Sequence, residues 1–179
     1  MLYFIALLPP DSIQDFATGI KQYFADNYDS KHAFKSTPHI TLQPPFEWDS
    51  SQIIDLEECL EKFVIGRNSI PIILDGYNAF APRVIYIDVV QSADLMNLQF
   101  ELMSDLETNL GIVDEVGKFR GFTPHMTVAF KDLKKSQFKA AWNEFDKKEL
   151  HFEFTASKLT LLKHEDKKWN ISKEFDFVF

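Results

Sequence analysis

Hydrophobic positions repeat with two periods along this chain, and they predict strands that alternate with helices. The apolar run from Met1 to Pro10 is typical of a buried strand. Asp11 can cap a helix to about Tyr28, with apolar residues at helical spacing on one face. We expect the remaining elements in this order: a strand from His39, a helix from Asp49–Ser51 to Gly66, strands Ile70–Leu74 and Val84–Val90 separated by turn signals at Gly76, Asn78 and Pro82, a helix Ser92–Gly111, a strand His125–Phe130, a helix through Phe138 and Phe145, and β-structure over Leu150–Thr155, Leu159–Leu162 and Trp169–Phe179.

The order of these elements repeats, which indicates a duplicated unit. The strand near Val84 corresponds to the strand near Leu2, and the His125 strand corresponds to the His39 strand. No Gly/Ser-rich linker separates the halves, approximately residues 1–80 and 81–179. We therefore expect an α+β protein with one two-lobed domain over residues 1–179 and a pseudo-twofold relation between the halves.

The repeat is clearest at two pentapeptides, Thr-Pro-His-Ile-Thr at residues 37–41 and Thr-Pro-His-Met-Thr at residues 123–127. Both follow a helix and a loop, and both begin an expected strand. Alternate residues of a strand share a face, so each His lies on the same face as the Thr two residues later. If the halves are related by a pseudo-twofold axis, His39 and Thr41 can face His125 and Thr127 across a cleft.

Two opposed imidazoles suit acid–base chemistry at neutral pH, because one ring can take a proton while the other gives one to a leaving oxygen. The Thr hydroxyls can hold a phosphoryl oxygen where charge builds up. The alternative is that each His is hydrogen-bonded locally and each Thr is present for its β-propensity. Duplication of the whole motif favours catalysis by His39, Thr41, His125 and Thr127.

Charge limits the partners that we expect. The formal net charge of −8 over 179 residues disfavours duplex DNA and anionic membranes. Residues 30–46 and 116–131 nevertheless contain no Asp or Glu, as expected if these segments meet around a small anion. Lys35 and Arg120 are the candidates for contacting phosphate. Cys59 is the only cysteine, which favours a reducing, cytoplasmic setting. The apolar N-terminus has no basic segment before it and is too short to span a membrane, so we expect no membrane association. We also expect a monomer.

These motifs resemble those of the two-histidine phosphoesterase superfamily, in particular the bacterial 2′-5′ RNA ligase-like cyclic phosphodiesterases. Phe80-x-x-Arg83-Val-Ile-Tyr86 is similar to that family's middle strand. The resemblance implies antiparallel sheets that line a central cleft, helices on the outside and both termini in one lobe. It also implies metal-independent opening of 2′,3′-cyclic phosphates at RNA ends or nucleotides, with ligation to a 2′-5′ bond as the reverse reaction. The sequence departs from the family at Gln43-Pro44-Pro45-Phe46, where relatives often carry a hydrophobic residue and glycine.

For the roles of the two histidines in catalysis, the hypothesis is that His125 is the general base and His39 the general acid. Phe46, Tyr86 and Phe130 are candidates for stacking on a base, and a place in the core is the alternative for each. No phosphate-binding loop of the Gly-x-x-x-x-Gly-Lys type is present, so ATP dependence is not indicated, and we expect no cofactor.

Other classes of function receive less support. A metal hydrolase would need further ligands such as His32, His151 or His164, and we expect no metal. No Gly-x-Ser-x-Gly motif points to a serine hydrolase. The main alternative is a non-catalytic module that holds an RNA terminus or a nucleotide in the same cleft.

Overall fold

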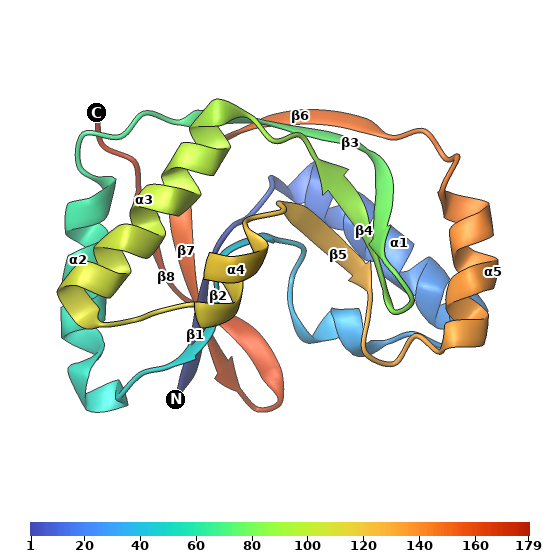
Figure 1. The fold of residues 1–179 in the computed structure, drawn as a ribbon, viewed down its shortest axis with the longest axis horizontal. Coiled ribbons are helices and arrows are strands. Elements are labelled where there is room, and N and C mark those ends of the chain that lie inside the picture. Colours follow the sequence, from blue (N-terminus) through green and yellow to red (C-terminus); the bar gives the residue numbers. More distant parts are fainter.

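Two four-stranded sheets, antiparallel throughout, form the frame of the protein (Figure 1). The structure is a computed structural model that describes all 179 residues. The first sheet, here the terminal sheet, has the order β2 (Ile40–Glu47), β1 (Leu2–Leu7), β7 (Lys158–Glu165) and β8 (Lys168–Asp176). The second, here the central sheet, has the order β5 (His125–Ala129), β4 (Val84–Val89), β3 (Ile70–Phe80) and β6 (His151–Ala156).

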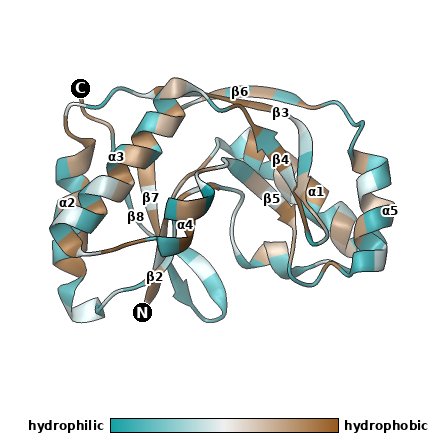
Figure 2. Ribbon diagram, in the orientation of Figure 1, coloured by the Kyte–Doolittle hydropathy of each residue, from teal (hydrophilic) through white to brown (hydrophobic).

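Helices cover one face of each sheet. The helices are α1 (Asp11–Tyr28), α2 (Ile53–Val64), α3 (Ala93–Leu110), α4 (Glu115–Arg120) and α5 (Lys135–Phe145), with 3₁₀ turns η1 (His32–Lys35) and η2 (Ser50–Gln52). Helices α1 and α5 pack on the central sheet, whereas α2 and α3 pack on the terminal sheet. Apolar and polar residues alternate along these helices, as Figure 2 shows. The expected α+β class with a duplicated unit is confirmed.

The two halves of the chain exchange elements. The last strand of the first half, β3, pairs with β4, and β7 from the second half pairs with β1. Helix α1 follows β1 but packs against β5, and α3 follows β4 but packs against β2. Neither half therefore contains a complete sheet with its own covering helices, which explains why no linker separates them.

Hydrogen-bond register repeats between the halves. In β1 and β2 the pairs are Ile5–Gln43, Ala6–Thr41 and Leu7–Ile40, and in β4 and β5 they are Ile85–Ala129, Tyr86–Thr127 and Ile87–Met126. A register shift separates the first and second pair in both sheets. The motif strands of the two halves are thus held against their neighbours in the same way.

Helices α1 and α3 span the residues that their sequences indicate. The expected cap of α1 is wrong, because Asp11 is the first helical residue and the N-cap is Pro10, where no side chain forms a capping hydrogen bond. The side chain of Ser92 accepts a hydrogen bond from the Leu95 amide at the start of α3, and Gly111 ends that helix with φ 67°. A left-handed residue at this place satisfies the last carbonyl groups, and glycine adopts it without a Cβ clash.

The helix expected from Asp49–Ser51 to Gly66 is a 3₁₀ turn, η2, followed by α2, and the structure also differs from the expectation at β3 and α4. Strand β3 does not end before Gly76 but continues to Phe80, because a register shift between Leu74 and Tyr77 takes up Gly76 with φ 71°. Helix α4 was not expected from the sequence. It is only six residues long, too short for a clear hydrophobic period, and Asp114 caps it by accepting from the Gly117 amide.

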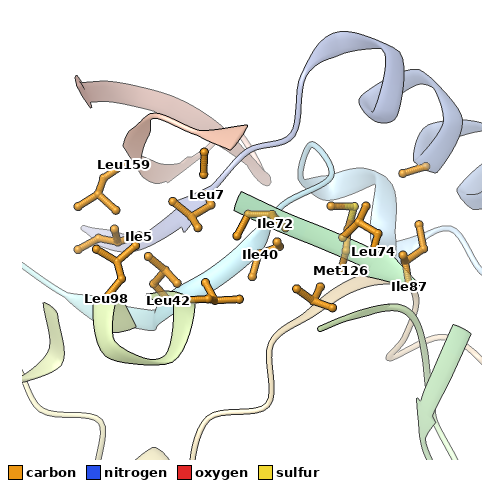
Figure 3. Packing of buried hydrophobic residues seen from close by; sticks show 14 of the residues in the cluster. Ile5, Leu7, Ile40, Leu42, Ile72, Leu74, Ile87, Leu98, Met126 and Leu159 are labelled. Carbon is orange, nitrogen blue, oxygen red and sulfur yellow. The ribbon is translucent and has the colours of Figure 1, made fainter. Parts of the chain in front are cut away.

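A core of 36 buried residues joins both sheets to their helices. Figure 3 shows part of it, with Ile5, Leu7 and Ile40 continuing into Ile72, Leu74 and Met126. A smaller cluster of Phe4, Ala6 and Leu162 lies apart from this core. None of the helices combines the length and the apolar character that crossing a membrane requires.

Candidate active site

The two His-x-Thr motifs lie on strands that face each other between the sheets. Strands β2 and β5 are the edge strands of the terminal and the central sheet, and they contact each other. His39 immediately precedes β2 and His125 is the first residue of β5. Both side chains are half-buried. Burial is the largest cause that lowers the pKa of His39, and a charge on His125 lowers that pKa further.

Each imidazole makes the same local hydrogen bond. Nδ1 of His39 lies 2.7 Å from the carbonyl oxygen of Thr37, and Nδ1 of His125 lies 2.7 Å from the carbonyl oxygen of Thr123. A carbonyl can only accept, so Nδ1 donates in both rings. In the neutral ring this leaves the unprotonated nitrogen at Nε2, where it can take a proton or bind a substrate.

His39 has an apolar surrounding. Its ring lies 4.8 Å from the Phe4 ring, which in turn contacts Trp169 at 4.7 Å. Burial lowers the pKa of His39 to about 4; the hydrogen bond to the Thr37 carbonyl acts in the opposite direction, and Lys21 lowers the pKa further. His39 is therefore neutral near pH 7 in the unliganded protein.

His125 is also packed between aromatic rings, with Tyr86 at 5.1 Å and Phe80 at 5.0 Å. Burial lowers its pKa, while the Thr123 carbonyl and the carboxylate of Asp88 raise it. Asp88 is the residue of β4 that pairs with His125. A carboxylate near His125 and an ammonium near His39 make the two rings unequal, and protonation is favoured at His125.

The two threonines complete the motif. Thr41 on β2 pairs with Ala6, and Thr127 on β5 pairs with Tyr86. Both are half-buried, and neither hydroxyl forms a hydrogen bond within the protein. Each hydroxyl therefore has its donor free for a ligand oxygen.

A cavity of about 970 Å³ opens beside His125 and Thr41. Helix α3 forms one wall, and residues 112–123, including α4, form another. Its lining is mostly apolar and includes Phe80, Met96, Phe100, Met103 and Phe122. A volume of this size suits a small organic molecule with an apolar or aromatic part.

Charged groups at the cavity are mostly paired. Glu107 accepts from Lys118 at 2.7 Å, and Asp114 caps α4. Arg120 also lines the cavity and forms no ion pair. Of the two phosphate-contacting candidates from the sequence, Arg120 thus lies at the site with its charge available.

Six candidates from the sequence are absent from the lining of this cavity: His39 and Thr127 of the motifs, and Lys35, Phe46, Tyr86 and Phe130. Lys35 is exposed on η1. Burial lowers the pKa of His32 and the charge of Lys35 lowers it further, and the His32 ring lies 4.8 Å from the Phe130 ring. Phe46 packs against Tyr3, at 6.3 Å between ring centroids, and against the main core. Tyr86 is buried beneath His125, so it supports the imidazole and offers no open ring face.

Sequence reasoning missed several residues at the site. The cavity wall on α3, with Met96 and Met103, lies beside the expected stripe of leucines, and no polar residue type marks it. Asp88 carried a usable signal, because it is an acidic residue inside the otherwise apolar strand Val84–Val89. A titratable group in such a place commonly acts on a neighbour.

No group of three or more His, Cys, Asp or Glu side chains is close enough to hold a metal ion. The three additional histidines weighed for a metal site have separate neighbours: His32 contacts Phe130, His151 contacts Glu153 and His164 contacts Trp169. The arrangement of side chains thus offers acid–base and hydroxyl groups.

Comparisons with known proteins identify the family of this chain. A family model described as the 2′-5′ RNA ligase superfamily matches residues 9–168. A candidate phosphoesterase of Geobacillus sp. (strain WCH70) is 31% identical over 178 residues, covering 98% of this chain and 95% of that protein. The crystal structure of E. coli LigT in apo form has a TM-score of 0.70 at 15% identity, covering 99% of this chain and 97% of LigT. TT0787 of Thermus thermophilus has a TM-score of 0.69 at 16% identity, covering 99% and 98%.

The family model covers most of the chain, and the Geobacillus protein aligns over nearly all of both sequences. The likeness to LigT extends the agreement to the fold. The chain belongs to the 2′-5′ RNA ligase superfamily and has the phosphoesterase fold of that family.

Proposed function

We propose that this protein is a metal-independent phosphodiesterase that opens 2′,3′-cyclic phosphates of RNA ends or nucleotides by paired-histidine catalysis. The observation that carries the proposal is the matching hydrogen bond of His39 and His125 to a backbone carbonyl. It leaves two Nε2 atoms on facing edge strands, beside two threonine hydroxyls with no partner in the protein.

In the proposed reaction, water attacks phosphorus while one Nε2 takes its proton. The bond from phosphorus to one ribose oxygen breaks, and the other imidazolium gives its proton to that oxygen. The product is a phosphomonoester, and the net proton count is unchanged. Thr41 and Thr127 donate to the non-bridging oxygens as charge grows on them. If the 5′-hydroxyl of a second RNA takes the place of water, the same steps open the cyclic phosphate and join the two RNA ends.

The electrostatic difference between the rings favours one assignment of roles. An acid must carry a proton when the substrate is bound, and Asp88 favours the protonated form of His125. His39 has the pKa of about 4 and remains unprotonated. We therefore propose His39 as the base and His125 as the acid, the reverse of the hypothesis made from the sequence.

The cavity beside His125 can receive the nucleoside. E. coli LigT has been crystallised with 3′-AMP and with NADP⁺. In the present protein we propose that the base lies against Phe80 and Phe100, with Arg120 near the phosphate. Apolar contacts of this kind accept several bases, so the site would favour a phosphate geometry over a sequence.

A substrate panel tests the proposal. The protein, treated with EDTA, would be incubated with 2′,3′-cyclic mononucleotides, RNA with a 2′,3′-cyclic end, 2′-5′ oligoadenylates and ADP-ribose 1″,2″-cyclic phosphate. We expect phosphomonoester products from at least one cyclic phosphate and unchanged rates after EDTA. Loss of activity with EDTA and its return with a divalent metal would contradict a metal-independent reaction.

A further inference from the structure

Lys21 is a charged residue buried in α1 without an acidic partner. It is the only charged residue among the buried residues, with 2% exposure. Nζ donates to the carbonyl oxygens of Ala33 at 2.9 Å and Ser36 at 2.8 Å. Burial lowers the pKa of Lys21 to about 8. Burying an ammonium group costs free energy, which its hydrogen bonds only partly offset. A buried lysine that holds one loop in this way therefore suggests a role for that loop.

Gln14, also on α1, holds the same loop further along. Its Nε2 donates to the carbonyl oxygens of Pro38 at 3.3 Å and Pro9 at 3.2 Å, and its Oε1 accepts from the hydroxyl of Thr37. Gln14 and Lys21 together fix residues 33–38, which end directly before His39. The Thr37 carbonyl that receives Nδ1–H of His39 belongs to this fixed segment.

The second half of the chain provides an internal comparison. Counted from the first residues of the two helices, Met96 and Met103 on α3 occupy the places of Gln14 and Lys21 on α1. Both methionines line the cavity, and no side chain of α3 hydrogen-bonds to residues 121–124. The hydrogen bonds from the helix to the loop are therefore a feature of the His39 side alone.

We propose that Lys21 is a positioning residue for His39, which with Gln14 fixes the loop so that the Thr37 carbonyl holds Nδ1–H and Nε2 stays free for the substrate. This proposal rests on the function proposed above. Lys21 also keeps a positive charge near His39. The charged groups that act on His39 are Lys21 from α1 and His125 from β5, and no carboxylate opposes them. Lys21 thus favours the neutral ring that a base requires.

The test compares Lys21→Met and Gln14→Leu with the wild type, and Lys139→Met serves as the control because Lys139 is an exposed lysine on α5. Lys21→Met keeps the length of the side chain but removes its donors and charge. NMR would follow the His39 ring through a pH titration and would identify which nitrogen carries the proton. Rates on a 2′,3′-cyclic nucleotide would be measured over the same pH range.

We expect the pKa of His39 to rise above about 4 in Lys21→Met but to stay below 6.5, because burial, the larger cause, is unchanged, and the acid limb of kcat/KM should move to higher pH. The kcat value should fall about tenfold to hundredfold with little change in KM, because a loosened loop misplaces the ring. Gln14→Leu should lower kcat and weaken the Nδ1–H signal of His39, and Lys139→Met should leave both readouts unchanged.

A folded Lys21→Met protein with wild-type titration of His39 and wild-type kcat would overturn the proposal. If Lys21→Met does not fold, Gln14→Leu decides: an unaltered Nδ1–H signal and unaltered kcat would overturn it. The NMR readout is independent of turnover. A wild type without activity would refute the proposed function, yet a shifted His39 titration in Lys21→Met would still support positioning.

Discussion

Asp88 on β4 is paired with His125 on β5, and its carboxylate raises the pKa of that imidazole against the effect of burial. His39 has no comparable partner, since the rings next to it are those of Phe4 and, beyond it, Trp169. The two copies of the motif share their backbone geometry but differ in charge. This difference is the reason for proposing His125 as the acid and His39 as the base.

Replacing Asp88 tests that difference. In Asp88→Asn the pKa of His125 should fall, because the charge that favours its protonated form is removed. Less of the acid is then protonated near pH 7, so kcat should fall by about threefold to tenfold and the alkaline limb should move to lower pH. Asp75→Asn is the matched control, an exposed position on the same sheet opposite His151. A pH–rate profile of Asp88→Asn that matches those of the wild type and of Asp75→Asn would show that Asp88 does not affect the protonation of His125.

A change of leaving group separates the two histidines. Bis(p-nitrophenyl) phosphate releases a weakly basic phenolate that needs no acid. His125→Ala should therefore keep its rate on this ester within about tenfold, yet lose about 100-fold or more on a cyclic nucleotide. His39→Ala should lose activity on both substrates, because each reaction needs a base. The opposite pattern would restore the sequence-based hypothesis of His125 as base and His39 as acid.

The threonine hydroxyls can be tested without changing side-chain shape. Thr41→Val and Thr127→Val should each lower kcat by about 100-fold, as loss of a donor to a developing oxyanion does elsewhere. Thr41→Ser and Thr127→Ser retain the hydroxyl and should keep most of the activity. Steady-state kinetics with a thermal melt of each variant would check this. Valine variants as active as the wild type would show that the hydroxyls do not contact the reacting phosphate.

Burial of neutral His39 makes stability depend on pH. The pKa of His39 is about 4 in the folded protein, against 6.5 for a solvated imidazole in the unfolded chain, so the unfolded chain takes up the proton first as the pH falls. The free energy of unfolding should thus decrease between about pH 6.5 and pH 4, by about 2 kcal/mol at pH 5 from this residue. Urea unfolding of the wild type and His39→Gln would measure it. An equal loss in both proteins between pH 7 and pH 5 would contradict this origin.

The sequence was sufficient to predict the parts of the fold that depend on local signals. Helix α1 and the two ends of α3 follow from the hydrophobic period, Ser92 and Gly111. Strand β3 was predicted too short, because a glycine in a bulge has the same sequence signal as a glycine in a turn. Helix α4 has too few residues to show a period.

Prediction of the site depended on the duplicated motif. Thr41, His125 and Thr127 lie on the facing strands β2 and β5, and His39 directly precedes β2, as expected of a duplicated unit. Lys35 and Phe130 lie elsewhere, because nearness in sequence to a motif does not fix where a loop side chain points. The cavity wall on α3 is formed by residues far along the chain from Thr41, and only the packing of α3 against β2 brings them together.

The proposed reaction requires His39 and His125 to open a cyclic phosphate together. The most direct measurement is product formation in a single turnover of a 2′,3′-cyclic nucleotide, with enzyme in excess and EDTA present, together with binding of the same compound. Wild type should form the phosphomonoester, and His39→Ala and His125→Ala should each bind the compound but react at least about 100-fold more slowly. Wild-type rates in both variants, or binding by the wild type without any product, would contradict the account, and the second result would favour a nucleotide-binding module.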